Sequence, residues 1–460
     1  MPSTRDLVEA QAFGRRRLVT ALVSGAPGHE PEPSGPGRAV VGGVALALLL
    51  VAGYAVAGLL IGRDPAGWDR PGLLVSQDTG ALYLIVEERD EPVLHAVGNA
   101  TSARLILGED LDPTVLAEDT IAAQRRGEDL GIAGAPPTVP DGDRLVQDGW
   151  TACTSGGGAL AVDVSPVPGA RPVAGSGLTV HSEGRYHVVA TAREEPGKPR
   201  AAYRYALPDG VEPDPLLAAL GLPITAEATE VPGRWLRLFP PGGDLSLTPD
   251  GYGGPAPQQG PGRLPVGARI GQLVTVDGET VSLLTAHGPA ELDPFALAVY
   301  RAAPRPAVVP PVGLEPVRLD AAPQVTAARP PYAGAHWPDD LLQAVTGEPC
   351  ALLDAGPGRP PATLLASDPD DASSAAGLVA PAVRVGVRPG HGAYVRAGDR
   401  ELVVAPPGVA HPLADDEAAG SLGYEPDDAS LVPDAWLELF EPGVALSRAA
   451  ALAPPSPGGA

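Results

Sequence analysis

The chain has little of three things: lysine, aromatic residues and cysteine. Lys198 is the only lysine in 460 residues, and 32 basic residues face 56 acidic ones, which gives a formal net charge of −24. Nucleic-acid binding needs a basic face, so this balance argues against nucleic acid as a partner. Aromatic residues make up 4% of the chain, so its cores must be built from Ala, Val and Leu. Two cysteines exclude a disulfide-dense miniprotein.

Glycine and proline are abundant instead, with 58 and 56 residues, together about a quarter of the chain. Such a share borders on low complexity, and the lack of a three-residue glycine period excludes collagen. Yet 44% of the residues are hydrophobic and 19% are charged, which is enough apolar material for folded cores. The composition predicts a turn-rich chain of more than one module.

One long apolar run, residues 39–61 (AVVGGVALALLLVAGYAVAGLLI), has no charge and no proline. As a helix rising about 1.5 Å per residue, it is long enough to cross a bilayer core of about 30 Å. A cleavable signal peptide is the alternative, because Ala55-Val56-Ala57 resembles a cleavage site. The run is longer than a typical signal core and follows a long polar segment, so we favour a retained single transmembrane helix.

Basic residues before this run set its predicted orientation. The arginines concerned are Arg15, Arg16, Arg17 and Arg38. They predict a cytoplasmic N-terminus and a large exported C-terminal part, which carries the excess of acidic residues. Within residues 1–38, an amphipathic helix is expected before a Pro/Gly-rich linker at 26–37. Its apolar face would dock a cytosolic partner or lie along the membrane; the alternative is that the arginines only fix the topology.

The exported part contains an internal duplication. A motif of the form Val-Pro-x-x-Trp-Leu-x-Leu-Phe occurs twice with an offset of 201 residues. The shared positions are Val231, Pro232, Trp235, Leu236, Leu238 and Phe239 in the first copy, and Val432, Pro433, Trp436, Leu437, Leu439 and Phe440 in the second. The repeat predicts two similar halves in tandem. Both tryptophans are expected to be core residues, with the anchoring of a partner as the alternative.

Each half is predicted to contain two smaller modules. Four short β-like runs follow a glycine, and apolar segments with helical spacing come after them. The glycines are Gly80, Gly184, Gly278 and Gly392. This order predicts an α+β fold with four strand-turn-strand-helix modules. His95 and His411 occupy corresponding positions after two of the runs, so a structural role is favoured over a catalytic one.

The two cysteines follow the same offset. Cys153 and Cys350 are 197 residues apart, so they occupy similar places in the two halves. If a pseudo-twofold axis relates the halves, two equivalent cysteines near it would meet, and an oxidising exported compartment would let them bond. Two independent buried thiols are the alternative. We favour the disulfide.

Several segments together resemble the EccB family, the single-pass core components of actinobacterial type VII (ESX) secretion systems. They include the start MPSTRDLVEAQAFGRRRLVTALV, the paired cysteines, the Trp-Leu motifs and the run Ser102-Ala103-Arg104-Leu105-Ile106-Leu107-Gly108. The resemblance runs essentially end to end, and this last run is its most specific part.

The resemblance implies an elongated exported domain with quasi-twofold symmetry, in which four repeat domains flank a central β-rich core with one disulfide. It also implies a place in the inner (plasma) membrane, contact with its lipids, companion subunits of the EccC, EccD and EccE type, and association of copies through the exported domain. The boundaries expected after the N-terminal segment (1–38) and the membrane helix (39–61) are modules at 62–130, 175–230, 265–320 and 380–430, core segments at 131–174, 231–264, 321–379 and 431–448, and a disordered tail at 449–460.

No catalytic motif emerges. Members of that family are labelled ATPases, but a P-loop needs Lys and a hydroxyl residue after its glycines, whereas Pro199 follows Lys198. Asp368, Asp370 and Asp371 are expected to form a solvated acidic turn rather than a cation site. We therefore expect no catalytic residue, cofactor or metal. The leading hypothesis is a structural subunit of a type VII secretion complex; the alternatives are an exported nucleotide hydrolase and a cell-wall-binding module.

Overall fold

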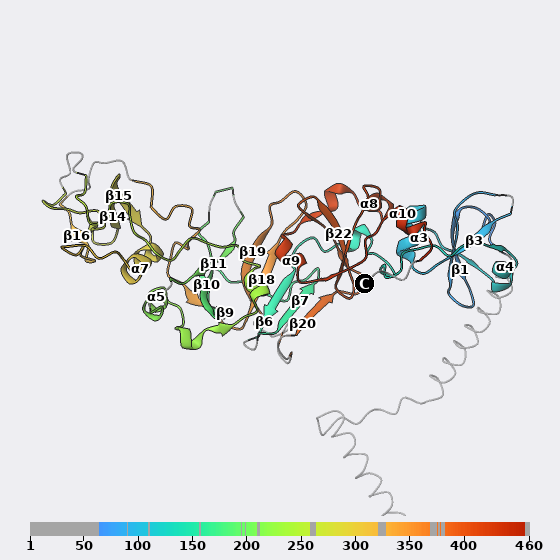
Figure 1. The fold of residues 1–460 in the computed structure, drawn as a ribbon, viewed down its shortest axis with the longest axis horizontal. Coiled ribbons are helices and arrows are strands. Elements are labelled where there is room, and N and C mark those ends of the chain that lie inside the picture. Colours follow the sequence, from blue (N-terminus) through green and yellow to red (C-terminus); the bar gives the residue numbers. More distant parts are fainter. Residues whose placement is uncertain are drawn as a thin grey trace, which may run out of the picture. The chain divides into compact units, whose positions relative to one another are not determined.

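The computed structural model describes residues 64–455 except 90, 109–110, 156–157, 195, 198, 209–211, 258–263, 321–327, 369–374, 376–377 and 379–381 (Figure 1). The predicted membrane helix at 39–61 and the N-terminal segment with its arginines lie outside the described residues. Within the described part, no helix combines the length and the apolar character needed to cross a membrane. From Gly67 onward the described residues belong to one structural unit.

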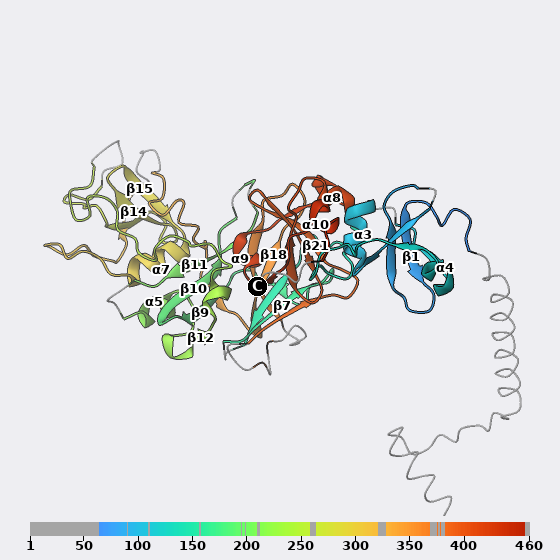
Figure 2. The same ribbon diagram turned by 45° about the vertical axis from the view of Figure 1, so that its right-hand side comes forward.

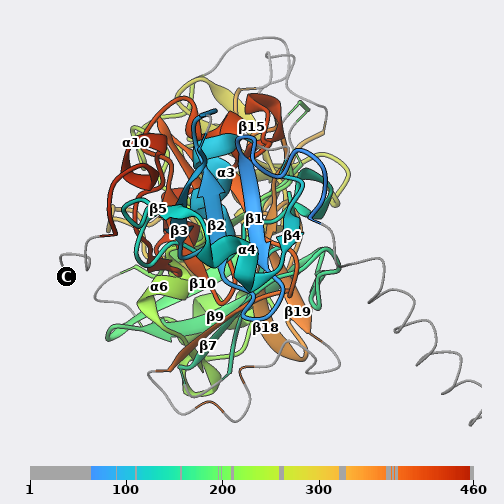
Figure 3. The same cartoon turned by 90° about the vertical axis from the view of Figure 1, so that its right-hand side faces the viewer.

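Four small sheets share one order of elements, and we call them meander sheets 1 to 4. Each has three consecutive antiparallel strands, then a helix, then a strand that pairs in parallel with the first of the three. Meander sheet 1 consists of β1 (Gly72–Ser76), β2 (Leu82–Ile85), β3 (Val93–Val97), helix α3 (Ala100–Leu107), β4 (Thr114–Leu116), helix α4 (Glu118–Ala122) and β5 (Arg125–Arg126). Figure 3 shows its strands in the order β5, β3, β2, β1, β4.

The other three meander sheets repeat this order with small additions. Meander sheet 2 has β9 (Ser176–Ser182), β10 (Arg185–Thr191), β11 (Ala202–Ala206), α5 (Asp214–Ala219) and β12 (Thr229–Glu230), followed by α6 (Gly233–Leu236). Meander sheet 3 has β13 (Leu273–Thr275), β14 (Val281–Thr285), β15 (Gly288–Leu292), α7 (Pro294–Ala302) and β16 (Val317–Arg318). Meander sheet 4 has β21 (Ala393–Ala397), β22 (Arg400–Ala405), β23 (Val409–Pro412), α8 (Ala418–Ser421) and β24 (Ser430–Leu431), followed by α9 (Asp434–Leu437), β25 (Glu441–Pro442) and α10 (Arg448–Ala451).

Besides the meander sheets, the fold contains a six-stranded sheet, which we call the central sheet. Its strands are β6 (Thr151–Thr154), β7 (Leu160–Val164), β8 (Arg171–Pro172), β18 (Glu348–Asp354), β19 (Ala362–Asp368) and β20 (Val383–Val387), in the order β20-β7-β6-β18-β19-β8. The middle pair, β6 and β18, is antiparallel and brings one strand from each half together. Further out, the halves exchange strands, because β20 of the second half pairs with β7 and β8 of the first half pairs with β19.

The meander sheets also pair across the two halves. Helix α3 of meander sheet 1 contacts α8 and α10, which follow the strands of meander sheet 4, and Figures 1 and 2 both show these helices side by side. Helix α5 of meander sheet 2 likewise contacts α7 of meander sheet 3. One buried apolar cluster joins sheets 1 and 4 through residues such as Leu105 and Leu422, and another joins sheets 2 and 3 through residues such as Leu217 and Phe295. The halves are therefore interlocked.

The first hairpin of each meander turns at a glycine with a positive φ, a conformation that costs other residues free energy. The φ angles are 69° at Gly80, 79° at Gly184, 93° at Gly278 and 63° at Gly398. The β-like run expected after Gly392 is confirmed as β21, but it is a first strand, whereas the runs after the other three glycines are second strands. A glycine before an apolar run does not reveal which strand of the hairpin follows.

Two further expectations differ from the structure. The order strand-turn-strand-helix is incomplete, because a third strand precedes each helix and a fourth follows it. The tail expected to be disordered from residue 449 begins inside helix α10, in which the Ser447 side chain accepts a hydrogen bond from the Ala450 N–H at 3.1 Å. Ala451 is fully buried. This cap and the packing against α3 order the segment despite its Ala- and Pro-rich composition.

Candidate functional site

The two cysteines lie at the middle of the central sheet. Cys153 on β6 and Cys350 on β18 face each other in the strand register, their Cα atoms are 4.0 Å apart, and their Sγ atoms form a disulfide. Both residues are fully buried, among small apolar neighbours that include Ala170 and Ala366. The bridge thus joins equivalent positions of the two halves, as expected for residues close to a pseudo-twofold axis.

The two Trp-Leu motifs pack against one face of the same sheet, in a single apolar cluster with Ala152 and Ala351. In each copy, a valine follows the last parallel strand, a proline precedes a one-turn helix (α6 or α9), and the tryptophan is fully buried. The Trp235 indole N–H donates to the Ala152 carbonyl at 2.8 Å, next to the disulfide, and that of Trp436 donates to Thr363 Oγ1 at 3.0 Å. Eight further motif residues are buried in the same cluster, namely Val231, Leu236, Leu238, Phe239, Val432, Leu437, Leu439 and Phe440, while Pro232 and Pro433 are half-buried. Both tryptophans are therefore core residues.

A second pair of equivalent positions meets beside these motifs. Arg237 and Glu438 correspond at the 201-residue offset, and a guanidinium nitrogen of the first lies 3.7 Å from a carboxylate oxygen of the second. Their side chains are 52% and 58% exposed, so this ion pair contributes at most about 1 kcal/mol. The ion pair is informative about symmetry rather than stability. Together with the disulfide, it gives two contacts between equivalent residues of the two halves.

The histidines predicted to be structural pack against glycines. A Cβ on Gly127 would lie 2.3 Å from the His95 ring, and a Cβ on Gly443 would lie 2.4 Å from the His411 ring. Each imidazole Nδ1 also contacts the carbonyl of the residue after its glycine, at 2.8 Å for His95 and 3.1 Å for His411. Burial lowers the pKa of His411 below its usual value. These contacts support a structural role for both rings.

We expect Gly443→Ala to lower the free energy of unfolding by about 1–3 kcal/mol, because the new methyl group would overlap the buried His411 ring. The matched control is Gly420→Ala in helix α8, where a Cβ meets no atom within 4 Å and where alanine favours the helix. Chemical denaturation monitored by tryptophan fluorescence measures both. Equal stability of the two variants would show that the ring is free to move away.

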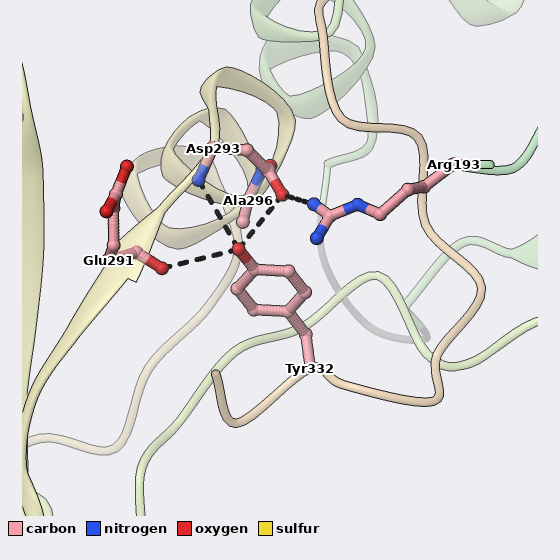
Figure 4. A network of polar contacts seen from close by, with 5 residues as sticks. All are labelled: Arg193, Glu291, Asp293, Ala296 and Tyr332. Carbon is pink, nitrogen blue, oxygen red and sulfur yellow. Dashed lines mark hydrogen bonds and ion pairs between the residues drawn. The ribbon is translucent and has the colours of Figure 1, made fainter. Parts of the chain in front are cut away.

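A polar network that the sequence did not reveal joins meander sheets 2 and 3 (Figure 4). Asp293 caps helix α7 by accepting from the Ala296 N–H at 2.7 Å, accepts from the Tyr332 hydroxyl at 2.9 Å, and pairs with Arg193. Burial raises the pKa of the Asp293 carboxyl, against the opposing effect of these donors. Burial also raises the pKa of Tyr332. The network links segments up to 139 residues apart. Its one trace in the local sequence is Asp293, which stands directly before a proline at the start of a helix.

Chemical motifs considered in the sequence do not assemble into a reaction centre within the described ranges. No group of three or more His, Cys, Asp or Glu is placed there to hold a metal ion. Lys198, Asp370 and Asp371 lie outside the described residues. The expectation of a solvated turn is wrong for Asp368, which ends β19 and is fully buried.

Fold and disulfide together define the class: an α+β domain of two interlocked halves, with four meander sheets in two pairs and a central sheet whose middle strands are joined by a disulfide. A model of the family described as type VII secretion system ESX-1, transport TM domain B, matches residues 1–455, and the chain belongs to this family. This confirms the resemblance read from the sequence and makes the chain a component of type VII secretion.

Individual relatives agree along most of the chain. The ESX-1 secretion system ATPase EccB1 of Mycolicibacterium smegmatis (strain MKD8) is 25% identical over 446 residues, which cover 90% of this chain and 87% of the relative. A chain in the intact ESX-5 inner membrane complex is 23% identical with a TM-score of 0.60, and covers 100% of this chain and 97% of its own length. The EccB3 dimer from the ESX-3 core complex is 22% identical with a TM-score of 0.59, over 83% and 100%. These likenesses confirm the sheet-rich α+β fold.

Proposed function

We propose that the chain is a membrane-anchored structural subunit of a type VII (ESX) secretion complex. Residues 39–61 form its single transmembrane helix, residues 1–38 stay in the cytoplasm, and the part from residue 62 onward lies on the exported side of the inner membrane. The observation that carries the proposal is the buried Cys153–Cys350 disulfide, because such bonds persist outside the reducing cytoplasm. The apolar run and the arginines before it agree with this orientation.

The interlocked sheets give the exported part the rigidity that a scaffold needs. Through it, copies of the chain associate with each other and with companion subunits of the EccC, EccD and EccE type. The neighbours named as an inner membrane complex and as a dimer from a core complex support this assembly. The module ranges 62–130, 175–230, 265–320 and 380–430 stand as proposed boundaries. Each contains one meander with its helix and parallel strand, apart from Leu431 at the end of β24, but the last range also takes in β20 of the central sheet.

The assembly is tested by gentle detergent extraction of the native membrane followed by native mass spectrometry. We expect more than one copy of the chain in a particle that also contains the companion subunits. Recovery of the chain alone, under conditions that keep the other subunits together, would contradict the scaffold role.

The orientation is tested with single added cysteines and a membrane-impermeant maleimide on intact cells. Val167→Cys places a thiol on a residue that is 71% exposed, and Ser3→Cys places one in the N-terminal segment. We expect labelling of the first variant in intact cells and of the second only after permeabilisation. The reverse pattern would overturn the proposed topology.

An exported nucleotide hydrolase is the second candidate, because the relatives of this chain carry the word ATPase in their names. ATP turnover by the purified complex, measured alongside its composition, separates the two. Turnover that persists in the isolated chain and disappears with a point substitution that leaves its stability unchanged would favour the hydrolase.

A further inference from the structure

The outer strand β20 of the central sheet has backbone groups that bond to no described residue. It pairs in parallel with β7 on one side and is the last strand of the sheet on the other (Figure 1). The Ala382 carbonyl and the Arg388 N–H each form a hydrogen bond of 3.0 Å with β7, so alternate residues from 382 to 388 bond to that strand. The backbone groups of Val383, Val385 and Val387 therefore point away from β7. They have no hydrogen-bond partner among the residues that the structure describes.

The other sheet edges in the described part of the chain are protected. Most of the other outer strands are only two or three residues long. In the five-residue strand β11, the outward N–H and carbonyl of Arg204 bond to Pro240 and Gly242 at 3.0 and 2.8 Å. In β15, also of five residues, Pro289 has no N–H, and its carbonyl accepts from the Ala328 N–H at 3.1 Å. Folded proteins protect long sheet edges in such ways, so an unprotected edge of five residues indicates pairing with another strand.

One face of β20 carries positive charge. Arg384 and Arg388 alternate with Gly386 on this face, and both arginines are exposed. The half-buried Asp163 carboxyl of β7 lies near them: burial raises its pKa, and the two arginines act in the opposite direction. Because burial has the larger effect, this carboxyl compensates the two guanidinium charges only in part. Opposite charges on neighbouring strands attract, so a strand added at this edge is stabilised by acidic side chains on the arginine face.

The opposite face of β20 is apolar. Val387 is buried in the largest apolar cluster, and Val383 and Val385 are half-buried and pack against it. Apolar side chains on this face of an added strand would extend the cluster, and β-branched ones suit a strand best. Since side chains alternate between the two faces of a strand, a sequence that alternates acidic and β-branched apolar residues matches both faces at once.

We propose that the outer edge of β20 binds an extended segment of another protein, in which acidic and β-branched apolar residues alternate, as a further strand of the central sheet. Its backbone bonds to the outward groups of Val383, Val385 and Val387, and its acidic side chains lie on the face of Arg384 and Arg388. This inference goes beyond the scaffold role and does not depend on it. The net negative charge of the chain opposes the approach of an acidic segment at long range, but salt screens that field within about 10 Å.

The test uses the full chain in detergent and a fluorescent, C-amidated peptide of sequence Thr-Val-Glu-Val-Glu-Val-Thr. Fluorescence anisotropy measures its binding, and hydrogen exchange with mass spectrometry locates it. We expect saturable binding and slower exchange in the fragment that contains residues 383–387, with no change in β11, whose outer edge is already bonded. No saturation at millimolar peptide, or saturation without protection of residues 383–387, would overturn the proposal.

Two N-methylated versions of the peptide test whether it binds as a strand. One is methylated on the backbone nitrogens of its valines and the other on those of its glutamates, so each loses the donors of one edge. A strand bonds to its neighbour through a single edge. We therefore expect one version to lose at least tenfold in affinity and the other to bind like the parent peptide. Equal affinities of the two versions would contradict pairing through the backbone.

The charge of the partner is tested on both sides of the contact. Arg388→Gln should weaken binding about threefold, because one cross-strand charge pair is lost. Arg301→Gln is the matched control, since this arginine is exposed on α7, far from β20 in the chain. A peptide with glutamine in place of glutamate should bind more weakly to wild type, and equal affinity of the two peptides would contradict an acidic partner.

A second copy of the chain is the competing occupant of this edge. Protection of residues 383–387 that appears without peptide and grows with the concentration of the chain would assign the edge to a second copy and overturn the proposal. The scaffold role is tested separately, because native mass spectrometry of the extracted complex uses no added peptide. Either proposal can therefore fail while the other stands.

Discussion

Removing the disulfide in a Cys153→Ala, Cys350→Ala double variant is expected to lower the free energy of unfolding by about 5 kcal/mol. The bridge closes a loop of 197 residues, and in the chain-entropy model a loop of that length strongly restricts the unfolded chain. The effect should be large because the bridge joins the two halves at the middle of the central sheet. Urea denaturation of the full chain in detergent, monitored by tryptophan fluorescence, measures it.

The control for this experiment is wild-type protein that is reduced while unfolded and kept reduced. It should match the double variant, because both lack only the cross-link. Thiol titration of the denatured wild type provides a second check, with two thiols expected only after reduction. Equal denaturation midpoints for oxidised wild type and the double variant would show that the bridge does not stabilise the fold.

Truncating either motif tryptophan should also be severe. We expect Trp235→Ala and Trp436→Ala each to cost about 3–5 kcal/mol, because each removes a fully buried indole from the largest apolar cluster. Trp235→Ala also leaves the buried Ala152 carbonyl without its side-chain donor. Thermal or urea unfolding of the purified full chain measures both variants, and similar losses are expected from the two halves.

Tyr186→Ala is the matched control, since it removes an aromatic ring that is 37% exposed at the start of β10. Its cost should stay near or below about 1 kcal/mol. Trp235→Phe tests the hydrogen bond more narrowly, because an aromatic ring is kept while the indole N–H is lost. A tryptophan variant no less stable than Tyr186→Ala would mean that the motif is a surface feature.

Local sequence was enough to predict some of this architecture. The 201-residue offset identified the Trp-Leu motifs, and the similar spacing of Cys153 and Cys350 predicted their meeting. Both inferences rest on comparing two copies of one sequence pattern. Such a comparison does not require knowing which distant strands pair in the fold. The α+β class followed in the same way from short β-like runs and helical segments.

The rest depended on partners far apart in the chain. The exchange of β8 and β20 between the halves could not be predicted from the sequences of these strands. A strand of two or five residues has too little hydrophobic periodicity to indicate which strand it pairs with. The apolar run after Gly392 was predicted, but not that it is a first strand whose hairpin turns at Gly398. Asp293 and Tyr332 are 39 residues apart, with a Pro-rich stretch between them, so their contact could not be predicted locally.

The strand exchange sets an order of events during synthesis. When the first half has left the ribosome, β7 still lacks the outer neighbour that β20 will provide, and the apolar face of meander sheet 1 still lacks meander sheet 4. The growing chain therefore keeps a sheet edge and an apolar face open until meander sheet 4 has been made. Because Cys350 precedes β20 and meander sheet 4 in the chain, the single cross-link can form before these last elements arrive and hold the two halves together for them.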